Sequence, residues 1–182
     1  MYYTKLAAMK KGNLNRRNSF WRRWLTKWLI TRLRKNSVEM RTYILQLLGK
    51  IGDENALPVI FEATRDSDST IRGFAISALA DLRDDRAIDA LIGALDDPEI
   101  DIRATVAMAL GKFRDERANN ALLTLLNDEE SSVRAQAIIS LGNLGSIQAL
   151  PVLKQMITNE PSEWMRRYIS QSIREIEGGL YT

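Results

Sequence analysis

The sequence contains no cysteine and no histidine among its 182 residues. The absence of cysteine excludes disulfides, thiolate nucleophiles and thiolate zinc sites, and it is compatible with a reducing compartment. The absence of histidine excludes imidazole as a general base or a metal ligand. An enzyme built on this chain would depend on carboxylates, arginine or tyrosine, and no group of these residues stands out as a catalytic site. We therefore predict no cofactor and no metal.

Long hydrophobic runs are also missing. No stretch approaches the ~20 apolar residues that a helix needs to cross a bilayer. Charged residues interrupt positions 20–35, where a signal peptide would need its apolar core. The arginine-rich, acid-free start has the composition of an organelle transit peptide as an alternative. We predict a cytoplasmic protein, with peripheral membrane association as an option.

Acidic residues are absent from one part of the chain only. Residues 1–36 contain 11 Lys or Arg and no Asp or Glu. The other 146 residues hold the remaining 15 basic residues against all 23 acidic ones, a net charge of −8. A basic arm is thus attached to an acidic body, which indicates an anionic partner for the arm.

The body repeats itself every 31 residues. Arg41, Arg72, Arg103 and Arg134 share this spacing, and Arg166 follows after 32. Each arginine follows an apolar residue, and further apolar residues lie four and eight positions after that one. This is the spacing of one face of an α-helix. The stripe in the first two copies consists of Met40, Ile44 and Leu48, then Ile71, Ala75 and Leu79.

Two columns of polar residues share the period. They are Asp53, Asp84, Asp115 and Ser146, and Asp66, Asp97, Asp128 and Asn159. The first column is predicted to cap a second helix in each repeat. The second is predicted to accept N–H groups of the next helix or to meet an arginine of a neighbouring repeat. Because both recur in every copy, we interpret them as structural.

These patterns predict an all-α fold, a right-handed α-solenoid of helix pairs with a single capping helix at each end. Predicted helices span residues 38–51, 54–65, 69–82, 85–96, 100–113, 116–127, 131–144, 147–158 and 162–177. Residues 1–18 are predicted to be a basic flexible tail and 19–36 a basic, Trp-rich amphipathic cap. Residues 37–177 form the array of four pairs and a last helix, stopped by Gly178-Gly179, and 178–182 form a tail.

The capping segment has an unusual aromatic content. Trp21, Trp24 and Trp28 fall within about 60° of one another on a helix. Arg22, Arg23 and Lys27 lie on the opposite arc, and Asn18 and Ser19 supply an N-cap. We predict that Trp21, Arg22, Arg23, Trp24, Lys27 and Trp28 bind a partner or an anionic membrane surface.

A structural interpretation of the same segment stays open beside this one. Shifted by two periods, Leu29 and Leu33 coincide with Leu91 and Leu95 of a second helix. The leucines thus predict that the segment packs on the first pair. The tryptophans fall mostly outside that core set, so we expect them to be available for binding.

The repeats MRTYILQLLGKIGDENALPVI (40–60) and IRATVAMALGKFRDERANNALL (102–123) resemble the HEAT-like repeats of the phycobilisome (bilin) lyase type. The resemblance covers residues 38–177 and implies the solenoid fold. It implies bilin lyase subunits, phycobilisome-degradation factors, iron-dependent hydroxylases or adaptors as relatives. The hydroxylases bind metal through His-Glu pairs, which this chain lacks, and bilin lyases are generally longer, two-subunit assemblies.

We expect a non-catalytic scaffold, adaptor or assembly factor that binds a partner protein or complex, with a photosynthetic complex as one option. Its groove is predicted to be lined by Glu62, Arg65, Arg86, Asp89, Arg117, Asn120 and Gln155. The alternatives are a bilin lyase-like subunit and nucleic-acid binding through the arm, with the tryptophans stacking on bases. The acidic body disfavours nucleic acid.

Overall fold

The computed structural model describes residues 19–33 and 36–179, and this part is built from α-helices and two short 3-10 helices. The first helices of the repeats are α3 (Val38–Ile51), α5 (Ser69–Leu82), α7 (Ile100–Leu110), α9 (Ser131–Leu144) and α11 (Glu163–Gly179). The second helices are α4 (Leu57–Ala63), α6 (Ala87–Ile92), α8 (Glu116–Leu125) and α10 (Leu150–Asn159). The 3-10 helices η1 (Glu54–Ala56) and η2 (Ile147–Ala149) precede α4 and α10.

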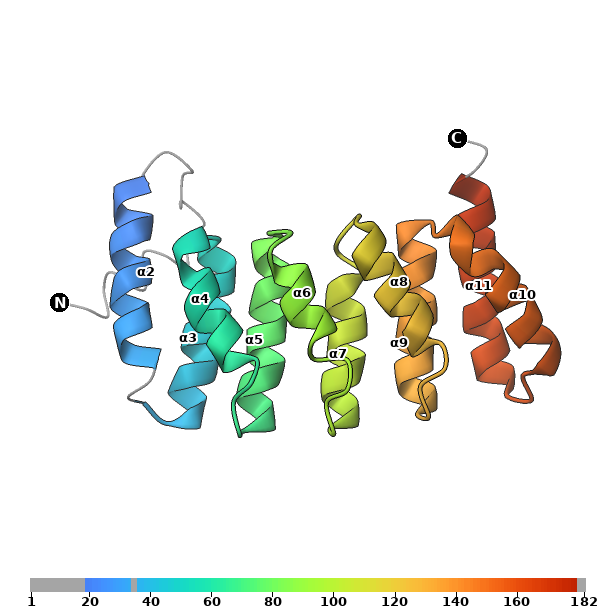
Figure 1. Ribbon diagram of the computed structural model, residues 1–182, viewed down its shortest axis with the longest axis horizontal. Helices are drawn as coiled ribbons and strands as arrows, with labels where there is room; N and C mark the ends of the chain where they lie inside the picture. The colour runs from blue at the N-terminus through green and yellow to red at the C-terminus, as the bar shows by residue number, and fades with distance from the viewer. Residues whose placement is uncertain (1–18, 34–35, 180–182) are drawn as a thin grey trace.

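The first helices stand side by side in a row, and the second helices lie obliquely across them (Figure 1). A further helix, α2 (Ser19–Leu33), stands at the N-terminal end of this row. The predicted all-α stack of helix pairs is thus confirmed. The predicted tail 1–18 lies outside the described residues, as do Asn18 of the predicted N-cap and 180–182 of the second tail.

Several predicted helix limits were wrong. The second helix predicted over 85–96 is only Ala87–Ile92, because the chain after it forms tight turns in which Leu95 N–H donates to Ile92 C=O. The predicted helix 54–65 begins as η1 and ends at Ala63. The last helix does not stop before the two terminal glycines but runs through Gly179.

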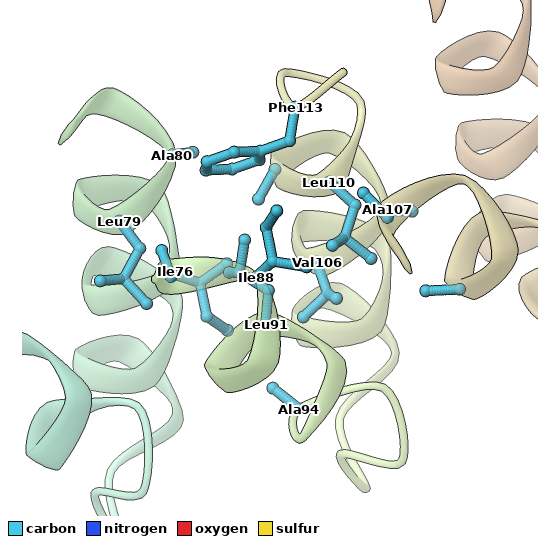
Figure 2. Packing of buried hydrophobic residues seen from close by; sticks show 14 of the residues in the cluster. Ile76, Leu79, Ala80, Ile88, Leu91, Ala94, Val106, Ala107, Leu110 and Phe113 are labelled. Atoms are coloured by element: carbon cyan, nitrogen blue, oxygen red, sulfur yellow. The ribbon is translucent and has the colours of Figure 1, made fainter. Parts of the chain in front are cut away.

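One continuous hydrophobic core fills the space between the two layers. The apolar stripe of each first helix is largely buried in this core, with Met40 of α3 as an exposed exception. Figure 2 shows one unit of this core, where Ile76 and Leu79 of α5 and Val106 of α7 surround Ile88 and Leu91 of α6. Each of these five side chains has no exposed surface. Burial of each large aliphatic side chain stabilises the folded protein by about 2 kcal/mol.

Small residues let successive first helices approach each other closely. A Cβ on Gly49 would lie 2.9 Å from the Cα of Ala78 on the next helix, and one on Gly111 would lie 2.7 Å from Ser140 Oγ. The buried Ser140 hydroxyl donates to Ala107 C=O at 2.9 Å. Gly49 is therefore a contact point inside α3, and Gly111, which caps the end of α7, makes the same kind of contact.

Arginine and aspartate side chains join consecutive repeats into an Arg–Asp ladder. Arg72 binds both carboxylate oxygens of Asp97 at 2.7 and 2.8 Å, and Arg103 binds those of Asp128 at 2.8 and 3.0 Å. Each arginine also donates to the main-chain carbonyl six residues before it, as Arg103 does to Asp97 at 3.0 Å. Arg41 also pairs with Asp66, but through a single carboxylate oxygen. The prediction that these columns are structural is consistent with this geometry.

The ladder changes the pKa values of its carboxyl groups. The hydrogen bonds from Arg103 outweigh burial and lower the pKa of Asp128. Burial raises the pKa of Asp97, but the hydrogen bonds and charge of Arg72 outweigh it, so the net pKa is also lowered. Both aspartates are therefore held in their charged form.

The last member of the aspartate column was assigned to the wrong residue. Glu160, not Asn159, accepts from the N–H two residues on (Ser162, 2.9 Å) and offers its carbonyl to Arg166 at 2.7 Å. The single extra residue in this repeat lies within α10, which extends to Asn159. The column therefore shifts by one position.

Candidate binding surface at the N-terminal end

Helix α2 is attached to the stack by its leucines and by one arginine. Leu29 and Leu33 are each 2% exposed within the common core, and Leu25 packs against it. The Arg22 guanidinium donates to Gly52 C=O at 2.8 Å, where α3 ends. The leucines predicted to pack on the first pair do so.

Two buried polar residues lie at this attachment. Thr26 of α2 is fully buried, and the buried Asp53 caps η1. Burial raises the pKa of Asp53, but hydrogen bonds from Asn55 and the charge of Arg22 outweigh it and lower the pKa. The charge of Arg22 thus links α2 electrostatically to the start of the second helix layer.

The six residues predicted as a site divide into two groups. Arg22 and Trp28 are half-buried: Arg22 binds Gly52, and Trp28 packs against the core. Trp21, Arg23, Trp24 and Lys27 are exposed. Burial depends on the angle at which α2 docks, which spacing within α2 alone does not specify.

The exposed aromatic rings of α2 contact one another. Trp21 and Trp24 are 54% and 48% exposed and pack edge to face with ring centroids 6.0 Å apart. Phe20, 71% exposed, packs on Trp21 in the same way. We call Phe20, Trp21 and Trp24 the α2 aromatic face. Sequence reasoning omitted Phe20, although its position beside Trp21 in an amphipathic segment was a usable signal.

Arg32 modifies the flank of this surface. Its guanidinium lies 4.1 Å from the centroid of the Trp28 ring, a cation–π contact. Arg32 itself is exposed. Arg32 therefore stacks on Trp28, and the aromatic side of the helix carries positive charge.

Ion pairs within and between repeats lie on the exposed side of the second helices. Arg86 binds Glu54 and Asp84 at 2.8 and 2.6 Å, and Arg117 binds Asp89 at 2.9 Å. These arginines were predicted to line a groove for a partner. These exposed pairs contribute less than about 1 kcal/mol each to stability, but they pair the charges of Arg86 and Arg117.

The described part of the chain provides little for small-molecule or metal chemistry. Across residues 19–33 and 36–179, no group of three or more Asp or Glu residues is arranged to hold a metal ion. Two shallow depressions occur there. One of about 270 Å³ is bounded by Arg22, Arg23 and residues 52–55, and one of about 300 Å³ lies between α5 and α7. Among the described helices, none has the length and apolar character required to traverse a bilayer.

Comparison with known families identifies the repeat type. The family described as HEAT repeats matches residues 26–102 and 88–174. These two matches extend from within α2 to within α11, which is most of the chain. No curated protein matches the sequence.

Solved structures share the architecture. The complex of CpcE and CpcF of phycocyanin lyase from Nostoc sp. PCC7120 matches with a TM-score of 0.72 and 20% identity, over 86% of this chain and 66% of that chain. This chain thus spans slightly less than two thirds of that relative. A designed armadillo repeat protein in complex with the peptide (KR)4 matches with a TM-score of 0.63 and 17% identity, over 81% of this chain and 80% of that one. At such identities the likeness shows the fold.

Proposed function

We propose a binding function for this chain, which belongs to the HEAT-repeat family. It acts as a non-catalytic scaffold, adaptor or assembly factor that holds a partner protein or complex. Trp21, Arg23, Trp24 and Lys27 on α2 make the main contact, and the solenoid surface supports it. Arg22 and Trp28 position α2.

The observation that carries this proposal is the exposed α2 aromatic face. Large aromatic residues dominate the energetics of protein interfaces, and on this helix they stand among cations with no acidic residue between 19 and 36. By contrast, the regularly repeated charges are used in the Arg–Asp ladder and in the pairs between second helices. We therefore assign partner binding to the exposed aromatic and basic residues of α2, which do not follow the repeat pattern.

The proposal is tested by affinity capture from the native lysate with chemical crosslinking. The intact chain is compared with Trp21→Ala/Trp24→Ala, and a matched variant, Trp164→Ala/Tyr168→Ala, serves as the control. Trp164 and Tyr168 form the same edge-to-face pair at 6.0 Å on α11 and are similarly exposed. We expect loss of a stoichiometric partner with the first variant only; equal capture by all three proteins contradicts the proposal.

A bilin lyase-like subunit is the second candidate, supported by the similarity to the phycocyanin lyase complex. In that case the chain would work with a second subunit on a phycobiliprotein. The test is the absorbance spectrum of added bilin with the purified chain, alone and with a lysate fraction containing phycobiliprotein. An unchanged spectrum in both arms removes this candidate and leaves the scaffold proposal intact.

An anionic membrane surface is a further partner class for α2, since tryptophan and basic residues suit the headgroup region. A photosynthetic, phycobilisome-related context for the partner is likewise a proposal, supported by the similarity to the phycocyanin lyase complex. Sedimentation with anionic vesicles separates a membrane from a protein partner.

A further inference from the structure

The first helix of the array has an edge that no described element covers. On α3, Met40 and Tyr43 are each 47% exposed and Leu47 is half-buried. The residues equivalent to Met40 in the later repeats, Ile71, Ile102, Val133 and Met165, are between 0% and 5% exposed. Those equivalent to Leu47, namely Ala78, Ala109, Ser140 and Ser172, are between 1% and 3% exposed. The equivalents of Tyr43 are half-buried (Phe74, Thr105 and Gln136) or exposed (Tyr168), so its exposure is ordinary for this position. We call Met40 and Leu47, together with the adjacent Tyr43, the α3 edge.

Contacts in the later repeats show what normally covers this edge. A Cβ on Gly73 of α5 would lie 3.2 Å from Ile102 on α7, and one on Gly49 of α3 would lie 2.9 Å from Ala78 on α5. Ile102 and Ala78 are the equivalents of Met40 and Leu47. In each repeat these positions therefore face the preceding first helix. The α3 edge is thus a docking surface for one more helix, which we call the seat.

Helix α2 stands at this end of the row without filling that seat. It buries Leu29 and Leu33 against the stack but leaves Met40 and Tyr43 about half exposed. Its own aromatic face adds further apolar surface, and α2 stands at the same end of the row (Figure 1). The N-terminal end thus combines an uncovered helix seat with exposed aromatic rings.

Charge restricts what can occupy the seat. Arg23, Lys27 and Arg32 on α2 are exposed, and residues 1–18 add five further basic residues with no acidic one. End-to-end stacking of two copies through this end would oppose these cations. Head-to-tail stacking would set the α3 edge against Arg167, Ser170 and Arg174 of α11, which supply no apolar stripe, and Arg167 is already paired with Glu163 at 2.6 Å. Like charges disfavour the end-to-end arrangement and the chain's own first 18 residues, and the polar surface of α11 disfavours the head-to-tail arrangement.

We propose that the α3 edge and the α2 aromatic face together bind an amphipathic helix of a partner protein, one whose apolar stripe is flanked by Asp or Glu. The helix lies beside α3 as α3 lies beside α5, with its carboxylates towards Arg23, Lys27 and Arg32. This inference rests on the proposed binding function and specifies its contact surface and the chemistry of the partner.

The test uses the full chain with Trp164→Phe, so that tryptophan emission reports only α2. The probe is a synthetic helical peptide of about 18 residues with a leucine stripe flanked by glutamates, about five helical turns. We expect a saturable blue shift of the emission. A peptide with lysine in place of glutamate is expected to bind at least about tenfold more weakly, since its charges oppose those of α2.

Matched variants locate the contact. Met40→Ser/Tyr43→Ser changes the α3 edge and leaves α2 intact, whereas Met108→Ser/Tyr168→Ser changes a methionine and a tyrosine of similar exposure elsewhere on the first helices. We expect about tenfold weaker peptide binding for the first and an unchanged affinity for the second. Thermal unfolding of both variants checks that they fold.

Several results overturn the proposal. These are equal affinity for both peptides, no loss with Met40→Ser/Tyr43→Ser, or a blue shift with anionic phosphatidylglycerol vesicles but not with the acidic peptide. Protection of the tryptophans from acrylamide in the free chain would show that the chain itself fills the seat. If lysate capture depends on Trp21 and Trp24 but not on Met40 and Tyr43, the binding function stands and the helix seat is wrong.

Discussion

The two ends of the helix row are built differently. On α11, the positions that would face a following first helix hold Arg167, Ser170 and Arg174, whereas the equivalent residues of α9 are Ala135, Ile138 and Gly142, in the interior. On α3, the positions that would face a preceding first helix hold Met40 and Leu47, with the exposed Tyr43 next to them. One end is polar and the other is apolar.

This difference shows what terminates a solenoid. Every internal repeat offers an apolar face to each neighbour, so an end needs polar residues at those positions to stop the addition of another helix. The C-terminal end satisfies this requirement through three substitutions. The N-terminal end satisfies it only in part, because α2 covers the core but not the α3 edge, and this end is where we place the partner.

The largest effect that tests this comparison is expected from the Arg–Asp ladder. Arg103→Ala leaves the largely buried Asp128 carboxylate without its partner, and we expect a loss of about 3 kcal/mol in the free energy of unfolding. Arg166→Ala, at the equivalent position in the terminal repeat, removes an exposed side chain bound only to carbonyls and should cost less than about 1 kcal/mol. Urea unfolding measures both; equal losses would show that the terminal repeat is held like an internal one.

Acid should weaken the internal repeats through the same carboxylates. The pKa values of Asp97 and Asp128 lie below the ordinary value of 3.8 in the folded protein, so the unfolded chain binds protons first as the pH falls. Their contribution to stability is complete above about pH 5 and is lost as the pH falls below about 4 and through the folded pKa values. Urea unfolding at a series of pH values from above 5 to below 4 should show this loss of stability, and Arg103→Ala should make the loss smaller. An unchanged pH profile in that variant contradicts the ladder's role.

Close helix contacts distinguish the interior from the C-terminal end. Gly111→Ala places a Cβ 2.7 Å from Ser140 Oγ and should destabilise the protein by about 1–2 kcal/mol through overpacking. Gly178→Ala, in the last turn of α11, meets nothing within 4 Å and should be neutral or stabilising by up to about 0.5 kcal/mol. Thermal unfolding of the two variants provides the measurement. A larger loss at Gly178 would show that the last turn of α11 has a neighbour.

The smallest effect on stability, less than about 1 kcal/mol, is expected from removing the polar cap. Arg167→Ala/Ser170→Ile/Arg174→Gly gives α11 residues typical of an internal first helix at these positions. We expect an increase in mass with concentration by light scattering, since the new apolar end is covered by another molecule. A mass equal to that of the unsubstituted chain at every concentration would show that these three residues do not terminate the row.

Much of the architecture could be predicted because it is encoded locally. The spacing of Arg41, Arg72, Arg103 and Arg134 specified the period, the apolar stripe specified the buried face, and the aspartate columns specified where helices meet. Predictions were less accurate where one residue changed the register. The extra residue near Asn159 moved the aspartate column to Glu160, and no pattern in a single copy could reveal which residue would take its place.

Within the candidate site, the sequence identified the helix but not the exposure of its residues. Arg22 and Arg23 are adjacent and chemically identical, yet one binds Gly52 and the other is exposed. Trp24 and Trp28 lie on one face of α2, yet only Trp28 packs against the core. Such differences depend on how α2 docks against α3 and η1, and that orientation is determined by contacts between segments.

The sequence by itself determined the repeat, the helix order and the basic, aromatic character of α2, because each depends on residue type and spacing within one segment. Only the tertiary structure decided which apolar residues were left uncovered. Met40 fits the stripe as well as Ile71 or Ile102 does, and it is 47% exposed because α2, the helix at the N-terminal end of the row, does not cover it. Burial depends on the presence of a neighbour, so equivalent residues in the sequence are structural within the row and available for binding at its end.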